Sequence, residues 1–142
     1  MDLKCLATKE NADEGIWEKV VIMGQEWPLE VKVYGSDSDA VQIYNRERIR
    51  RNASNTKFDP KKDAEKYISS LFENLDDSVE NAAVRIGGFR SLDDSPVLWN
   101  GKELKDDKDG YVEILRNVPA LAEFVLNVSN KRSNFLSDRK KD

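Results

Sequence analysis

The acidic run Asp106-Asp107-Lys108-Asp109-Gly110 is the stretch whose residue types come closest to a metal-binding loop. A calcium loop of the EF-hand type needs an oxygen ligand at its first position, glycine at its sixth and glutamate at its twelfth. When Gly110 takes the glycine position, Lys105 and Arg116 fall at the two ends of the loop. Both are cations, so the sequence predicts no metal site here and favours a solvated turn that caps the next helix.

Catalytic chemistry has few candidate residues in this chain. There is no histidine, and Cys5 is the only cysteine. The chain therefore lacks the side chain most often used as a general base, and it can form neither an intrachain disulfide nor a cysteine zinc cluster. Gly87-Gly88 lies in no nucleotide-binding glycine pattern, and we interpret it as the end of a helix. The sequence predicts a protein that is not an enzyme and uses no cofactor.

Arg46, Arg48, Arg50 and Arg51 form a basic run that could contact phosphates. No aromatic residue interleaves with them, and the whole chain carries a formal net charge of −4. An acidic protein repels polyanions on average. We therefore interpret the arginines as cations placed favourably near the C-terminal end of a helix, and we do not expect binding to nucleic acid. A small DNA-binding regulator is kept as an alternative.

Length and composition indicate one domain over residues 1–142. The hydrophobic fraction is 39% and the charged fraction is 35%, which is typical of a helix-rich globular protein with a strongly solvated surface. No run approaches the ~18 apolar residues that span a bilayer, and the first residues lack the apolar core of a signal peptide. We expect a cytoplasmic protein that does not contact a membrane.

The segment from about Trp17 to Tyr34 is expected to form a β-hairpin, because apolar residues alternate with charged ones in its second half. Its turn is placed at Gly24-Gln25-Glu26. Pro28 cannot donate a ladder hydrogen bond, so it belongs at the start or on the open edge of the second strand. Two strands alone are barely stable, so helices must cover their apolar face. The fold class is therefore α+β, with an N-terminal hairpin packed on a mainly helical domain.

Helical patterns fill about 37–136, before a polar tail over 137–142. Ser36 or Ser38 should cap the first helix. The region 89–109 is expected to be a loop pinned by a buried Trp99. The expected helices run from about Asp39 to Asn52, from Pro60 to Ile86, from near Tyr111 to Asn117, and onward from Pro119.

Tryptophan residues are core fillers by default, although tryptophan is also enriched in binding hot spots. Phe135-Leu136 is an apolar pair in an otherwise polar terminal run. Two interpretations stay open for this pair. It either folds back on the core or meets a partner.

The order of these features resembles that of the tail assembly chaperones of long-tailed bacteriophages. No single motif is specific, and their sequence along the chain carries the resemblance. The stretches concerned are Val33-Tyr34-Gly35-Ser36-Asp37-Ser38-Asp39-Ala40, the central amphipathic helix, Trp99-Asn100-Gly101-Lys102-Glu103-Leu104, Val118-Pro119-Ala120-Leu121, and Arg132-Ser133-Asn134-Phe135-Leu136.

The resemblance implies a non-catalytic phage or prophage protein that acts in the bacterial cytoplasm. Such a protein coats the helical tape-measure protein, helps recruit tail-tube subunits and self-associates. The candidate partner-binding residues are Trp99, Phe124, Phe135 and Leu136, some of which would line grooves for an apolar helical segment of the tape-measure protein. The alternative within phages is a structural tail-completion or head-tail joining protein.

Overall fold

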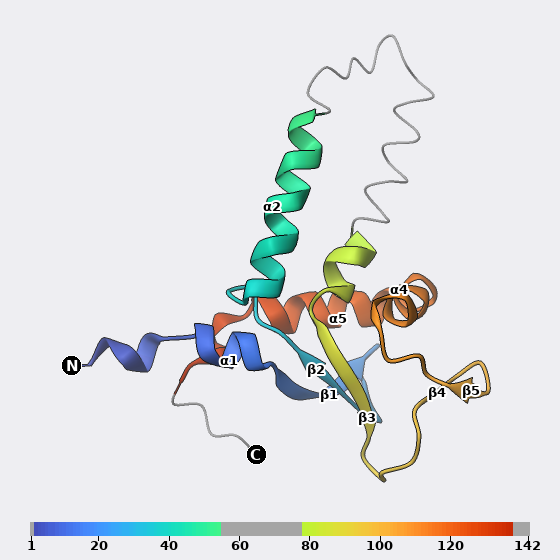
Figure 1. Cartoon of the computed structure of the whole chain (residues 1–142). Helices are drawn as coiled ribbons and strands as arrows, with labels where there is room; N and C mark the ends of the chain where they lie inside the picture. Colours follow the sequence, from blue (N-terminus) through green and yellow to red (C-terminus); the bar gives the residue numbers. More distant parts are fainter. Residues whose placement is uncertain (1, 55–77, 138–142) are drawn as a thin grey trace.

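A computed structural model of the chain describes residues 2–54 and 78–137 (Figure 1). The fold is α+β, as the sequence predicts: a three-stranded antiparallel sheet in the order β1-β2-β3 packs against helices, and a two-stranded hairpin stands beside it. The elements are η1 (Leu3–Leu6), α1 (Lys9–Glu14), β1 (Ile16–Ile22), β2 (Gln25–Val33), α2 (Asp39–Ser54), β3 (Ile86–Ser91), β4 (Leu98–Trp99), β5 (Lys102–Glu103), α4 (Lys108–Asn117), α5 (Pro119–Asn130) and η2 (Arg132–Phe135).

The expected N-terminal hairpin is confirmed, since β1 pairs with β2. Its turn is Met23-Gly24, where both residues have positive φ angles of 53° and 70°. Two-residue turns of this kind match the twist of the flanking strands. The predicted turn at Gly24-Gln25-Glu26 was therefore wrong, because Gln25 and Glu26 already pair with β1.

A third strand, β3, corrects the prediction that a helix continues to Ile86 and stops at Gly87-Gly88. Helical residues extend over 78–83, and Ile86 begins the strand that pairs antiparallel with β2. The glycines serve packing: a Cβ at Gly87 would lie 2.8 Å from the ring of Tyr34. Glycine within a strand is typical where another group approaches the backbone closely.

Pro28 lies in β2 just before Leu29, the first residue of β2 that pairs with β3. Its carbonyl oxygen accepts a hydrogen bond from Leu92 N at 3.3 Å, so the position of its missing N–H also faces this side of β2. The strand β3 has ended there, at Ser91, and no ladder partner among the described residues requires the N–H. This agrees with the expected place of Pro28 on an open edge of the second strand.

The region 89–109 also differs from the predicted loop. Leu98–Trp99 and Lys102–Glu103 form a short hairpin, and its turn is Asn100-Gly101 with φ angles of 54° and 80°. Asn-Gly is the strongest short-range signal of a two-residue hairpin turn. Trp99 is half-buried, and not the fully buried residue that the loop interpretation required.

The helix limits in the second half follow the prediction closely. The helix α4 ends at Asn117 and α5 begins at Pro119, where proline occupies the first turn of the helix. The helix α2 begins at Asp39 as expected, and the Ser38 hydroxyl accepts a hydrogen bond from the N–H of Val41 at 3.4 Å. The predicted helix beginning at Pro60 lies outside the described residues except for its last turns.

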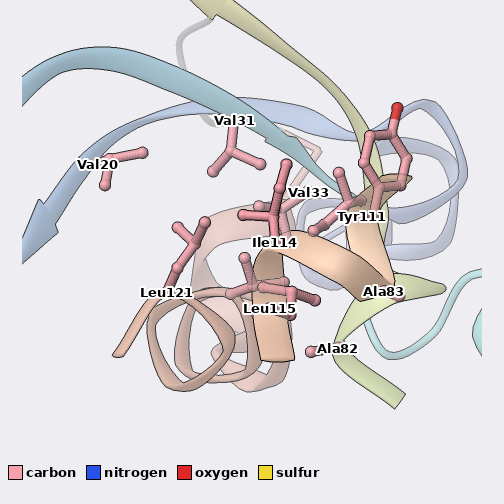
Figure 2. Packing of buried hydrophobic residues seen from close by; sticks show 11 residues of the cluster. Val20, Val31, Val33, Ala82, Ala83, Tyr111, Ile114, Leu115 and Leu121 are labelled. Atoms are coloured by element: carbon pink, nitrogen blue, oxygen red, sulfur yellow. The ribbon is translucent and has the colours of Figure 1, made fainter. Parts of the chain in front are cut away.

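The core lies between one face of the sheet and the helices α4 and α5 (Figure 2). The sheet contributes Val20, Val31 and Val33, residues 78–83 contribute Ala82 and Ala83, and α4 and α5 contribute Tyr111, Ile114, Leu115, Leu121 and Val125. On the opposite face of the sheet the side chains of Trp17, Lys19 and Val21 are exposed. Within the described ranges, no helix combines the length and the apolar content that a membrane crossing requires.

Candidate functional site

The β4–β5 arm, which we define as residues 97–104, stands away from the body of the protein (Figure 1). Two hollows adjoin the arm. The first hollow, the edge groove, has a volume of about 290 Å³ and lies between β3 and the arm. The second, the arm–α4 hollow, has a volume of about 250 Å³. Glu103 and Leu104 line both, so the arm is a shared wall.

Trp99 is the predicted partner-binding residue that lies in a hollow. It lines the arm–α4 hollow together with Leu104 and with Gly110 and Glu113 of α4. Its side chain packs partly against the core, and the hydrogen bond from Leu104 N to Val97 O, 2.8 Å long, closes the base of the arm. Leu98, its neighbour in β4, is 58% exposed. The arm thus presents one largely exposed apolar side chain, Leu98, to solvent.

The base of the arm is fixed by the first turn of α4. The carboxylate of Asp107 accepts a hydrogen bond from Gly110 N at 2.9 Å, which confirms the predicted capping turn. A Cβ at Gly110 would lie only 1.9 Å from the carbonyl oxygen of Lys105. Glycine is therefore required where the chain that leaves the arm crosses the start of the helix.

Tyr111 connects the segment between the arm and α4 to the sheet. Its hydroxyl donates a hydrogen bond to the carboxylate of Asp106, and its ring meets that of Phe89 edge-on with centroids 5.7 Å apart. Burial, and then the neighbouring Asp106 carboxylate, raise the pKa of Tyr111 above its usual value. Tyr111 therefore stays a neutral donor and holds the Asp106 carboxylate at the wall of the edge groove.

The loop between β3 and the arm is ordered by one carboxylate. Asp93 accepts hydrogen bonds from the hydroxyls of Ser91 and Ser95, both at 2.5 Å, and from Ser95 N at 3.1 Å. These bonds favour the charged form and lower the pKa of Asp93 to about 2. Asp94 follows with a φ of 61°, a conformation that aspartate tolerates, and lies at the groove wall.

Arg90 is the cation of the edge groove, and it is already engaged. Its guanidinium lies 4.2 Å from the centre of the Trp17 ring on the open face of the sheet, and its Nε donates to Glu30 at 2.9 Å. The remaining charged residues in the groove wall are Asp94, Glu103 and Asp106. The groove therefore has an acidic surface, a property that emerges only when the fold brings these residues together.

The other predicted partner-binding residues do not join Trp99 in one groove. Phe124 of α5 is half-buried against the core. Phe135 is 1% exposed, and the side-chain amide of Asn11 donates to the carbonyl oxygens of Phe135 at 3.2 Å and Leu136 at 2.8 Å. The pair therefore folds back beside α1, at the opposite end of α5 from the arm (Figure 1). Phe135 belongs to the core, and Leu136 is half-buried.

Arg85 is a buried polar residue that the sequence did not single out. The residue is 4% exposed, and its Nε and Nη1 atoms have no hydrogen-bond partner among the residues that the structure describes. Burial lowers the pKa of the guanidinium. Asn81, four residues earlier, likewise has an unbonded side-chain oxygen. An arginine at the end of a helix gives no sequence signal of burial, because arginine is usually exposed.

Comparison with family models, with curated proteins and with solved structures finds no match for this chain. The described residues contain no group of three or more metal-binding side chains. In the basic run on α2, Arg51 lies 4.0 Å from Glu80 and 6.0 Å from the ring of Tyr44. The candidate functional surface is therefore the β4–β5 arm with its two hollows.

Proposed function

We propose that the chain is a non-catalytic assembly chaperone of the kind found in long-tailed bacteriophages, which binds the tape-measure protein and promotes assembly of the tail tube in the bacterial cytoplasm. The observation that carries this proposal is the order of sequence features from the Gly35-to-Asp39 helix start through Trp99-Asn100-Gly101 to Val118-Pro119. The same resemblance implies self-association and contact with tail-tube subunits.

The fold supports a binding role through its distribution of apolar surface. Leu98, Trp17 and Trp27 are each at least 36% exposed, although the chain has a core into which large apolar residues could pack. Leu98 belongs to the arm, and the two tryptophans belong to the sheet, so apolar side chains are available to a partner at both places. Trp99 adds a half-buried aromatic ring beside a hollow, the setting in which interface anchors are most often found.

Co-expression with the tape-measure protein encoded in the same genome tests the proposal. The chaperone should keep the tape-measure protein in the soluble fraction, and the two should purify together. Trp99→Asp should reduce the soluble yield because a charge in the arm–α4 hollow opposes an apolar ligand. A tape-measure protein that is equally soluble with and without this chain would contradict the proposal.

Leu3→Asp provides the matched control for this experiment. Leu3 is 72% exposed in η1 and lines neither hollow, so the same apolar-to-acid change there should leave the soluble yield unchanged. Circular dichroism of both variants should show the helix content of the parent chain. A loss of yield in both variants would assign the effect to net charge and not to Trp99.

A further inference from the structure

Within residues 2–54 and 78–137, the strand β3 pairs with β2 alone and so forms one edge of the three-stranded sheet. Successive residues of a strand turn their N–H and C=O groups alternately to the two sides. Leu92 N donates to Pro28 O of β2, and Arg90 lies opposite Glu30, so Phe89 and Ser91 turn their backbone groups toward the open edge. Ser91 O accepts a hydrogen bond from Asp94 N at 3.4 Å, so the groups offered to a further strand are the N–H and C=O of Phe89 and the N–H of Ser91. An unpaired edge is a template for a further strand.

The open edge of β3 is a wall of the edge groove, since Phe89, Arg90 and Ser91 all line it. Chain from the arm stands opposite and leaves a volume of about 290 Å³ between the two walls. That volume is close to the lower limit of typical ligand sites, which matches a short length of extended chain. Phe89, Val97 and Leu104 supply apolar surface for alternate side chains of such a segment.

The charge of the groove identifies the chemistry of its occupant. Asp94, Glu103 and Asp106 bring three carboxylates to the wall, whereas the single arginine is held by Glu30 and Trp17. Lysine or arginine side chains of a bound strand would meet these carboxylates, and complementary charge at such sites favours encounter and selects partners. A second copy of this chain paired edge to edge would place like charges together, which disfavours it.

We propose that the edge groove binds an extended, basic segment of a partner protein, in which lysine or arginine alternates with apolar residues, as a fourth strand beside β3. Main-chain hydrogen bonds to both backbone groups of Phe89 and to the N–H of Ser91 supply the pairing, and the carboxylates supply the selectivity. This site shares the wall residues Glu103 and Leu104 with the arm–α4 hollow of the proposed function, but it takes a strand and not a helix. Peptide binding tests this proposal and co-expression with the tape-measure protein tests the other, so the failure of one is distinguishable from the failure of the other.

An acetylated hexapeptide of alternating valine and lysine, added to the full chain labelled with ¹⁵N, tests the proposal. Amide signals of Phe89, Ser91 and the arm should shift in a saturable manner, and hydrogen exchange at Phe89 and Ser91 should slow. The same peptide with its alternate amides N-methylated should not bind, because it cannot complete the ladder. A valine–glutamate peptide should bind far more weakly.

Asp94→Asn is the matched variant, since Asp94 lines the edge groove but not the arm–α4 hollow. Asparagine keeps the shape and tolerates the positive φ, so the fold should be preserved. Affinity for the lysine peptide should fall by about two- to five-fold, the range for one exposed charge pair. Glu123→Gln, an exposed residue of α5 outside both hollows, should leave affinity unchanged.

Three results would overturn the proposal. They are equal binding of the N-methylated or the glutamate peptide, shifts confined to the open face around Trp17, and dimerisation without peptide that protects the Phe89 amide. The last result would identify a second copy as the occupant of the edge. Unchanged affinity of Asp94→Asn together with slowed exchange at β3 would contradict the role assigned to the carboxylates.

Discussion

Phe135→Ala should destabilise the whole fold, because the structure makes this residue part of the core and not part of a partner-binding surface. The side chain is 1% exposed, and its ring carbon Cδ1 would lie 3.2 Å from a Cβ placed at Gly35. Removal of a buried phenylalanine typically costs about 3 to 5 kcal/mol, which combines lost apolar transfer with the cavity that remains. The lower part of this range applies, since Phe135 lies in the short element η2, which packs mainly on α1 and α5.

The loss should extend beyond the ring, because Phe135 anchors a terminal segment that several hydrogen bonds hold in place. Ser137 donates through its N–H to Ala7 O at 2.9 Å and through its hydroxyl to Lys4 O at 2.8 Å. The Asn11 side chain binds the carbonyl oxygens of Phe135 and Leu136. If the ring is removed, these bonds hold a segment without an apolar anchor, and residues 135–137 should fray first.

Urea denaturation followed by tryptophan fluorescence measures the effect. We expect a loss of about 3 kcal/mol for Phe135→Ala, against a total that for single domains is about 5 to 15 kcal/mol. Leu136→Ala is the matched control, and its half-buried side chain should cost about 1 kcal/mol. A loss below about 1 kcal/mol for Phe135→Ala would refute the reasoning, because the ring would then not be held in the core in solution.

Two further substitutions test the polar groups of the fold. Arg85→Met should raise the free energy of unfolding by about 1 to 3 kcal/mol in the same assay, because an apolar side chain replaces a buried cation with two unbonded nitrogens. An unchanged free energy of unfolding would contradict this, because it would mean that other interactions offset the cost of burying the guanidinium. The hydrogen bond from the Thr8 hydroxyl, and then the Arg132 guanidinium, lower the pKa of Asp37 below its usual 3.8. The stability that this carboxylate contributes is therefore present above pH 3.8 and is lost as the pH falls through the lowered pKa. Thr8→Val should therefore flatten the acid limb of a plot of the urea midpoint against pH, with an unchanged limb as the contrary result.

The helix boundaries could be predicted because their signals are local. Pro119 sets the start of α5 through its fixed φ, and Ser38 provides a hydroxyl before α2. The strand β3 could not be predicted in the same way, because Ile86-Gly87-Gly88-Phe89 has no period-two pattern and becomes a strand by pairing with β2 more than fifty residues earlier. The hairpin turn at Asn100-Gly101 did carry a local signal, and the loop interpretation overlooked it.

The candidate site was predictable only in part, because local sequence signals do not show which distant residues the fold brings together. Trp99 was expected to be buried in a loop and is instead half-buried in a hairpin, where its side chain contacts the core and also lines a hollow. Phe135 left two interpretations open because its neighbours, Asn11 and Gly35, lie about a hundred residues away in the chain. The acidic edge groove could not be foreseen, because its carboxylates gather only once β3 has joined the sheet.

The shared wall of the two hollows makes their occupants interdependent. Glu103 and Leu104 face both the edge groove and the arm–α4 hollow, and the arm that carries them has strands of only two residues each. A ligand that draws the arm toward β3 must change the width of the hollow beside Trp99. If a strand in the edge groove changes the affinity of the arm–α4 hollow for its ligand, linkage requires that this ligand change the affinity of the edge groove for the strand by the same factor. A strand in the edge groove and a helical segment beside α4 would therefore bind cooperatively. The cooperativity is positive if both ligands favour the same position of the arm, and negative if they favour different positions.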